Sequence, residues 1–253
     1  MNYPFFCLKI YLLIKDEILY LSYSFICVMR IKLIIFYFLS IPFLAFAQKD
    51  SLSIGDRYAE DQLYFSVSYS QLFDQPTGIT KSNFSYALSG GFIKDIILNK
   101  SGTIAIAGGI GLGYDFFNHE LKVDEVDGTT VFTNDITTSK NIFKSYNLEF
   151  PFELRWRTST AIKYNFWRIY TGVKFLYNLD NNFQYRDSDE NQFKYSNVSA
   201  YNKLQYGLTI SAGYDAFTMN VFYGLSPVFK NGLLNEKAVD TKILKFGLIF
   251  YFL

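Results

Sequence analysis

Apolar and polar side chains alternate with a period of two along much of this chain. In residues 148–156, apolar side chains alternate with Glu149, Glu153 and Arg155. Successive side chains of a strand point to opposite faces, so this pattern predicts strands with one apolar and one polar face. We predict eight strands, which cover about residues 62–72, 82–93, 102–115, 148–156, 167–177, 204–214, 217–226 and 243–253.

The predicted strands are long enough to cross a membrane. They run to about 10–14 residues, whereas strands of globular proteins average about 5–6 and a tilted membrane strand needs about 9–11. After Leu44 the sequence has no apolar run of the roughly 18 residues that a membrane helix requires. Strands in lipid must pair all their backbone polar groups, which requires closure. The predicted fold is therefore all-β, an eight-stranded antiparallel transmembrane β-barrel with up-and-down topology.

The connections between the predicted strands alternate between short and long. In order they contain roughly 9, 8, 28, 8, 23, 3 and 15 residues, counted from pattern edges that are good to about a few residues. Outer-membrane barrels have short periplasmic turns and longer extracellular loops, and an even strand number places both termini in the periplasm. The short connections follow the second, fourth and sixth strands, as this topology requires. We expect two long polar loops, 116–143 and 179–201, at the cell surface.

The region before the barrel contains a secretory signal pattern. Arg30 and Lys32 precede the apolar run 33–44, and Ala45-Phe46-Ala47 fits a cleavage site. A longer membrane anchor over 18–44 is the alternative, but these two cations would interrupt it. We predict an upstream start assigned too early at 1–28, a signal peptide at 29–47, a short periplasmic segment at 48–60 and the barrel domain at 61–253. The predicted location is the cell outer membrane.

Composition narrows the possible chemistry. Aromatic residues form 20% of the chain, and the formal net charge of +1 gives no support for a nucleic-acid partner. Both cysteines, Cys7 and Cys27, precede the predicted cleavage site. The exported chain then contains no disulfide, cysteine metal site or cysteine nucleophile, and we expect no cofactor.

The barrel pattern assigns each face of a strand to lipid or to the interior. Eight strands enclose a space that side chains just fill, so we expect an ion-paired interior and no open pore. The interior candidates are Glu149, Glu153, Arg155, Arg168 and Lys174. Small residues would make room for them at Ala105, Ala107, Gly109, Gly111 and Gly113. Interfacial aromatic girdles are predicted at Tyr64, Trp156, Trp167, Tyr177, Tyr214 and Phe252.

The last predicted strand ends in alternating aromatic residues. This ending resembles the C-terminal signal that the barrel-assembly machinery recognises, and it implies that this machinery and outer-membrane lipid are partners. The residues that carry the signal are Phe246, Gly247, Leu248, Phe250 and Phe252.

Three short features of the sequence are candidate chemical sites. The run GGIGLG at 108–113 lacks the last glycine of a dinucleotide loop and no helix pattern follows it, which favours a barrel strand. His119, the single histidine, is expected to be solvated within a long loop. Asp187, Asp189 and Glu190 lack the glycine of a calcium loop and are expected to form a solvated charge run.

Residues 148–178, LEFPFELRWRTSTAIKYNFWRIYTGVKFLYN, together with the signal peptide and the FGLIFYFL ending, resemble the PorT-like family of outer-membrane β-barrel proteins. The matching features are the proline within the fourth strand, the short turn and the FWRIYTG run. The resemblance implies a link to type IX protein secretion and hence secretion-system proteins as partners. The resemblance identifies no catalytic residues in this chain.

Three function classes therefore remain open. The first is a non-enzymatic barrel with a structural or interaction role, assisting secretion as in the PorT-like family. The second is a small-solute porin, which would need a water-filled lumen. The third is a lipid-modifying enzyme that would depend on His119.

Overall fold

The computed structural model describes most of the predicted barrel domain. The described residues are 62–76, 79, 83–126, 129–133, 140–158, 167–215, 217–230, 233–234 and 237–252. The predicted upstream segment, signal peptide and periplasmic segment lie outside them. The described residues form no helix, and none therefore forms a helix long and apolar enough to cross a membrane.

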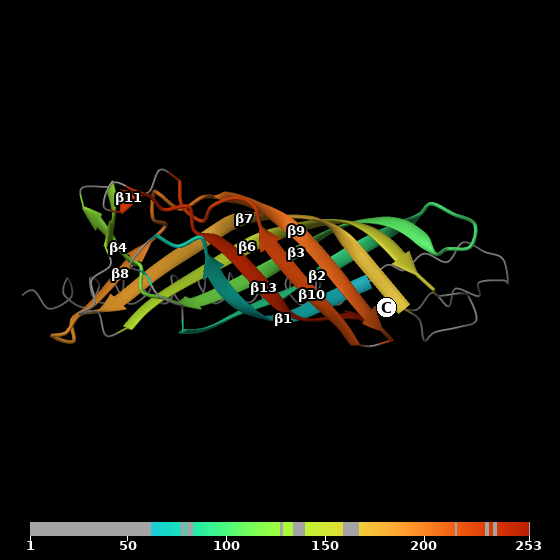
Figure 1. Ribbon diagram of the computed structural model, residues 1–253, viewed down its shortest axis with the longest axis horizontal. Helices are drawn as coiled ribbons and strands as arrows, with labels where there is room; N and C mark the ends of the chain where they lie inside the picture. Colours follow the sequence, from blue (N-terminus) through green and yellow to red (C-terminus); the bar gives the residue numbers. More distant parts are fainter. Residues whose placement is uncertain are drawn as a thin grey trace, which may run out of the picture. The chain divides into compact units, whose positions relative to one another are not determined.

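Eight long antiparallel strands close into a barrel (Figure 1). They are β1 (Gln62–Phe73), β2 (Asn83–Ile97), β3 (Ile104–Asn118), β6 (Lys140–Arg157), β7 (Trp167–Arg186), β9 (Leu204–Tyr214), β10 (Phe217–Gly224) and β13 (Lys242–Phe252). Each pairs with the next, and β13 returns to β1 from Leu63↔Phe252 to Phe73↔Lys242. No edge of the barrel is left open, and the predicted fold class is confirmed.

Five shorter strands lie within the long connections. They are β4 (Lys122–Val126), β5 (Thr129–Thr133), β8 (Gln192–Ser196), β11 (Leu233–Leu234) and β12 (Lys237–Ala238). In Figure 1, β4, β8 and β11 lie at one end of the barrel and the C-terminus at the other. We refer to the described parts of 119–133, 187–203 and 225–241 together as the head.

The prediction of long loops at 116–143 and 179–201 is wrong in its boundaries. Strand β6 begins at Lys140, and β7 continues to Arg186. Inward apolar residues such as Phe143 and Phe183 keep the period of two, but outward neighbours such as Lys144 and Gln184 are polar. The apolar outer face that marks a membrane strand is therefore missing where the strands extend past the lipid.

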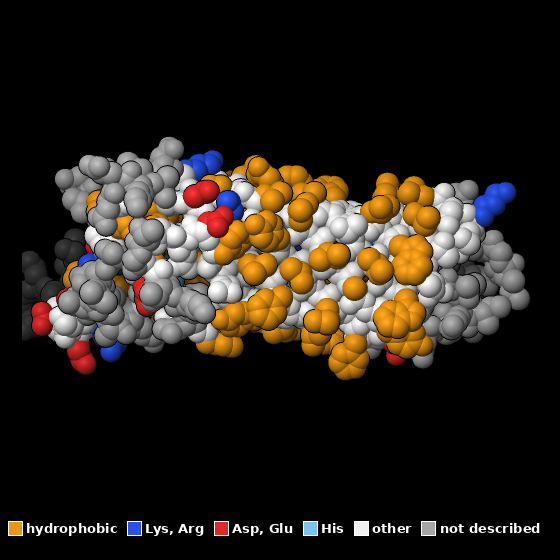
Figure 2. All heavy atoms as spheres, in the orientation of Figure 1, with side chains coloured by type: hydrophobic (Ala, Val, Ile, Leu, Met, Phe, Trp, Pro, Cys, Tyr) orange, Lys and Arg blue, Asp and Glu red, His pale blue; other side chains and the backbone are white. Residues whose placement is uncertain are grey.

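The outer surface of the barrel is an apolar belt. Figure 2 shows hydrophobic side chains gathered over the middle of the barrel. Among the predicted girdle residues, Trp156, Trp167, Tyr177, Tyr214 and Phe252 are exposed, from 44% to 59%. Tyr64 is only 4% exposed, so its assignment to a girdle is wrong. It shares the inward parity of Ser66 and Ser68 on β1, whereas Leu63 and Phe65 point outward.

Candidate functional site

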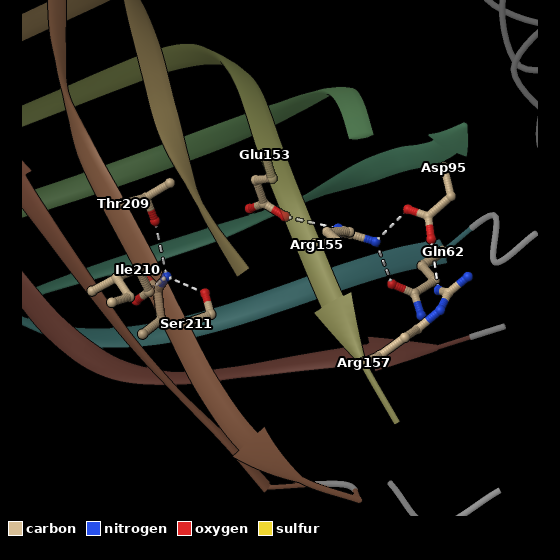
Figure 3. Close-up of polar contacts among 9 residues, drawn as sticks. Gln62, Asp95, Glu153, Arg155, Arg157, Thr209, Ile210 and Ser211 are labelled. Atoms are coloured by element: carbon tan, nitrogen blue, oxygen red, sulfur yellow. Dashed lines mark hydrogen bonds and ion pairs between the residues drawn. The ribbon is translucent and has the colours of Figure 1, made fainter. Parts of the chain in front are cut away.

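The interior near the short-turn end is filled by a cluster around Arg155. Its guanidinium donates from Nη1 to Asp95 Oδ1 at 2.7 Å and to Gln62 Oε1 at 3.0 Å, and from Nε to Glu153 Oε2 at 2.9 Å (Figure 3). Arg157 Nη1 donates to the other oxygen of Asp95 at 2.7 Å. Both arginine side chains are fully buried. Because a buried charge is tolerated only when it is paired, this cluster fixes three strands, β1, β2 and β6, against one another.

Glu149 and Lys174 form the next interior pair. Lys174 Nζ lies 3.0 Å from Glu149 Oε2, and the Tyr64 hydroxyl donates to the same oxygen at 3.5 Å. The strand β3 glycines make this arrangement possible. A side chain at Gly111 would collide with the Tyr64 hydroxyl, and one at Gly113 would lie 2.5 Å from Glu149 Oε1.

A third pair joins Lys245 and Asp115. Lys245 Nζ lies 2.5 Å from Asp115 Oδ1, while Asn147 Nδ2 donates to Asp115 Oδ2 at 2.8 Å. Asp115 is fully buried. The pair links the last strand to β3, so ionic contacts continue toward the head end of the barrel.

Arg168 has different surroundings from the other predicted interior residues. It is 7% exposed, its Nη2 donates to the Asp215 carbonyl at 2.9 Å, and its guanidinium lies 5.5 Å from the Tyr251 ring. The Arg155 guanidinium lies 4.4 Å from the Tyr170 ring centre and 5.2 Å from the Tyr251 ring centre. Arg168 thus contacts the turn after β9. The other four predicted interior residues are paired with one another, Glu153 with Arg155 and Glu149 with Lys174.

Little free space remains among these side chains. A cavity of about 10 Å³ lies between Tyr64, Pro151, Glu153, Lys174 and Tyr251. A single water molecule needs about 10–15 Å³ by this kind of measure. The described side chains around this cavity therefore fill the barrel interior there.

An aromatic plug fills the barrel at the head end. We define it as Phe117, Phe132, Phe143, Phe183, Tyr201 and Phe229, all 5% exposed or less. Phe143 stacks on Phe183 with ring centres 4.4 Å apart, and Tyr201 lies 5.3 Å from Phe143. Since Phe117, Phe143 and Phe183 project inward from barrel strands, the plug joins the barrel to the head through one hydrophobic core.

Hydrogen bonds hold the head together across distant parts of the chain. The Ser199 amide donates to Glu125 Oε1 at 3.0 Å, and the hydroxyls of Ser199 and Thr130 lie 3.0 Å apart. Lys230 N donates to the Ala200 carbonyl at 2.7 Å. The β4–β5 hairpin, the segment after β8 and the connection before β13 therefore support one another.

His119 lies inside this head, and the expectation of a solvated histidine is wrong. Its side chain is 4% exposed, neither ring nitrogen has a hydrogen-bond partner among the described residues, and the ring meets Phe143 edge-on. Burial lowers the pKa of His119 to about 4 because the charged form loses its hydration. The histidine belongs to the core that the plug forms.

The acidic run lies in an exposed turn between β7 and β8. Asp187 accepts hydrogen bonds from the Asn191 amide at 2.8 Å and from Asn191 Nδ2 at 3.0 Å. Asp189 and Glu190 are exposed. Among the described residues no group of three or more His, Cys, Asp or Glu side chains is placed to hold a metal ion.

The predicted C-terminal signal residues lie in β13, next to β1. Phe246, Leu248 and Phe252 are 37–55% exposed on the outer face. Gly247 pairs with Ser68, and a side chain there would collide with the β1 backbone. The interior residues that the sequence did not reveal are Asp95, Asp115, Arg157 and Lys245.

Comparisons with known proteins give one family match and distant likenesses to solved structures. Residues 46–230 match the family model described as outer membrane protein beta-barrel domain. Ail, the attachment invasion locus protein of Yersinia pestis, is 12% identical with a TM-score of 0.35, over 76% of this chain and 96% of its own. A mutant porin of Rhodopseudomonas blastica is 8% identical with a TM-score of 0.20, over 77% and 100% of the two chains. Neither likeness carries an argument about function at these scores. No curated protein matches the sequence.

Proposed function

Because the chain belongs to the outer membrane protein beta-barrel domain family, we propose that it is a non-conducting barrel with an interaction role at the cell surface. It is an integral protein of the outer membrane. The observation that carries the proposal is the combination of a packed interior with a head built on the aromatic plug. In outer-membrane barrels the longer connections lie outside the cell, which would present the head to the exterior.

The proposed biological role is assistance to protein secretion, as implied by the resemblance of 148–178 to the PorT-like family. Secretion-system proteins are the proposed partners and the head the proposed contact surface. Function in this class lies in loops more than in the scaffold, which supports the choice of the head.

A secretion assay tests this role. Cells that lack the chain should accumulate secreted proteins in the periplasm, and the wild-type chain should restore export. A variant in which residues 122–133 are replaced by a short turn should reach the outer membrane, shift on boiling as a folded barrel, and fail to restore export. Normal export in cells that lack the chain would contradict the secretion role.

The porin alternative is tested by liposome swelling. The packed interior predicts swelling in small sugars no faster than that of protein-free liposomes, whereas a water-filled lumen would give fast, size-dependent swelling. The enzyme alternative rests on His119, whose side chain is 4% exposed among aromatic rings. Cells that carry His119→Ala should therefore have unchanged lipid A.

A further inference from the structure

Strand β8 lies at the head end and has a neighbouring strand on one side only (Figure 1). At this end β7 leaves β9 and pairs with β8 instead, from Asn182↔Ser196 to Arg186↔Gln192. The other side of β7 remains paired with β6. No described strand pairs with the second side of β8. We call this second side of β8, residues 192–196, the open edge.

Hydrogen bonds at both ends of the β7–β8 ladder show which backbone groups point to the open edge. Asn197 N donates to the Asn181 carbonyl at 2.9 Å, and Asp187 N donates to the Asn191 carbonyl at 3.1 Å. In an antiparallel ladder, residues that bond to the neighbouring strand alternate with residues whose N–H and C=O point away. The odd-numbered residues of β8 therefore bond to β7. The N–H and C=O groups of the other three residues point to the open edge: Gln192, Lys194 and Ser196.

The open edge is accessible and carries an available positive charge. Gln192, Lys194 and Ser196 are all exposed. No hydrogen bond or ion pair joins the Lys194 side chain to another described residue. A ligand that pairs with this ammonium group therefore breaks no contact within the described part of the head.

The two faces of β8 differ in chemistry. Phe193 and Tyr195 lie on the inward face, together with Phe183 of the plug. Phe193 stacks on Tyr185 with ring centres 4.8 Å apart and is still 37% exposed. A strand added at the open edge would place an apolar side chain against this ring. On the outward face its central residue would lie directly opposite Lys194, where a carboxylate is attracted and an ammonium group is repelled.

Lys194 also restricts which strands can use the open edge. A lysine in a short edge strand is a usual protection against unselective pairing. Two copies of β8 that paired antiparallel through all three open residues would set Lys194 against Lys194, which is unfavourable. A strand with a carboxylate at the central position gains an ion pair instead. The charge therefore favours an acidic partner strand over a second copy of this chain.

We propose that the open edge binds an extended segment of a partner protein in which acidic and apolar side chains alternate. The segment adds a strand through the backbone groups of Gln192, Lys194 and Ser196. An acidic side chain pairs with the Lys194 ammonium group, and an apolar side chain contacts the Phe193 ring. This inference deepens the interaction role proposed for the head and rests on it for the location of β8 outside the cell. It does not depend on a role in secretion.

Amide hydrogen exchange, followed by NMR on the full barrel purified from the outer membrane, tests which groups bind. The probe is a seven-residue peptide of alternating valine and glutamate. The amides of residues 192, 194 and 196 should exchange fast in the free protein and slowly in an excess of peptide. The amides of 193 and 195 should exchange slowly in both states because they bond to β7. Unchanged exchange at 192, 194 and 196 would contradict the proposal.

Fluorescence anisotropy of the labelled peptide compares the affinities of variants. The wild type should bind the glutamate peptide more tightly than a peptide of alternating valine and lysine. Lys194→Gln should weaken binding of the glutamate peptide about fivefold, the upper end of what one cross-strand charge pair contributes. Lys194→Pro should abolish binding, because it also removes the central N–H of the open edge. The ladder with β7 keeps its donors in this variant.

Lys144→Gln is the matched control. Lys144 lies on the outward face of β6, a strand that is paired on both sides. This variant should bind the peptide as the wild type does, and every variant should still shift on boiling. Equal binding of the two peptides by the wild type, unchanged binding in Lys194→Pro, or a dimer that forms through β8 and excludes the peptide would overturn the proposal.

The result is separable from the test of the secretion role. Absent peptide binding by a chain that restores export would overturn the proposal for the open edge and leave the secretion role standing. Normal export in cells that lack the chain, together with selective binding of the glutamate peptide, would do the reverse.

Discussion

Arg155 shows how single residues hold this barrel together. Its guanidinium contacts Asp95, Glu153 and Gln62 from three different strands, with no exposed side-chain surface. In a soluble protein the core would be apolar, but here the apolar face is turned to lipid. The interior is therefore stabilised by pairing of buried charges, each of which depends on its partner.

Replacing Arg155 by Met should strongly destabilise the barrel. The change keeps an unbranched side chain but leaves Asp95 and Glu153 without their shared cation, at a cost of about 3–5 kcal/mol. Urea unfolding in lipid vesicles, followed by tryptophan fluorescence, measures the change. Lys242→Gln removes a cation whose partner Asp74 is 52% exposed and should have little effect. Equal midpoints for the two variants would contradict the role of the buried cluster.

His119 gives the head a dependence on pH. Its pKa is about 4 in the folded head and about 6.5 when exposed, so the unfolded state binds more protons between these values. Stability contributed by the neutral histidine is present above pH 6.5, is lost as the pH falls, and has gone by about pH 4. The difference corresponds to roughly 3 kcal/mol.

Urea titrations of vesicle-bound protein at several pH values, followed by circular dichroism, test this effect. The wild type should lose stability from pH 7 to pH 4 more steeply than His119→Phe, which fills a similar space without a titrating group. Parallel profiles for the two proteins would show that His119 does not titrate on unfolding.

Strand elements differ in how well the sequence predicts them, and the reason is the surrounding medium. The sequence predicts strand β9 at 204–214, and the structure has it at Leu204–Tyr214. The prediction is accurate because apolar and polar side chains alternate along the whole strand. Strands β6 and β7 are longer than predicted because their outer faces become polar beyond the lipid. The β4–β5 hairpin, at Lys122–Thr133, was missed because its packing depends on Phe229, which is distant in sequence.

The same reasoning explains what was predictable in the interior. Strong alternation in 148–156 and 167–177 assigned Glu149, Glu153 and Lys174 to the polar face. Asp95 and Asp115 lie on strands with weaker alternation, and their partners follow from the register between strands, which no local pattern reveals. Tyr64 was misassigned because an inward tyrosine needs space, and that space comes from Gly111 two strands away.

The aromatic plug connects the barrel to the head. A change in the plug should therefore destabilise the head while the barrel stays folded. Phe143→Ala removes a ring that stacks on both Phe117 and Phe183, and such a cavity costs about 3–5 kcal/mol. We expect external protease to cleave the head of this variant while the barrel still shifts on boiling. Phe193→Ala, at a 37% exposed position on β8, should remain as resistant as the wild type. Equal resistance of both variants would contradict the structural role of the plug.

At the scale of the whole molecule, closure between β1 and β13 makes the barrel possible. Eleven successive residue pairs join the first strand to the last, from Leu63↔Phe252 to Phe73↔Lys242. Closure removes every unpaired barrel edge from lipid, places the polar faces inside and gives the head a fixed base. The interior ion pairs and the apolar belt both depend on it.

Heat-modifiable gel mobility of outer-membrane fractions tests this closure most directly. Cells expressing the chain from Met29 should yield a detergent-resistant species that changes mobility only after boiling. A chain that lacks residues 242–253 cannot pair β13 with β1 and should run at one position with or without boiling. A full-length chain that fractionates as soluble, or that shows no shift in the outer-membrane fraction, would contradict the closed barrel.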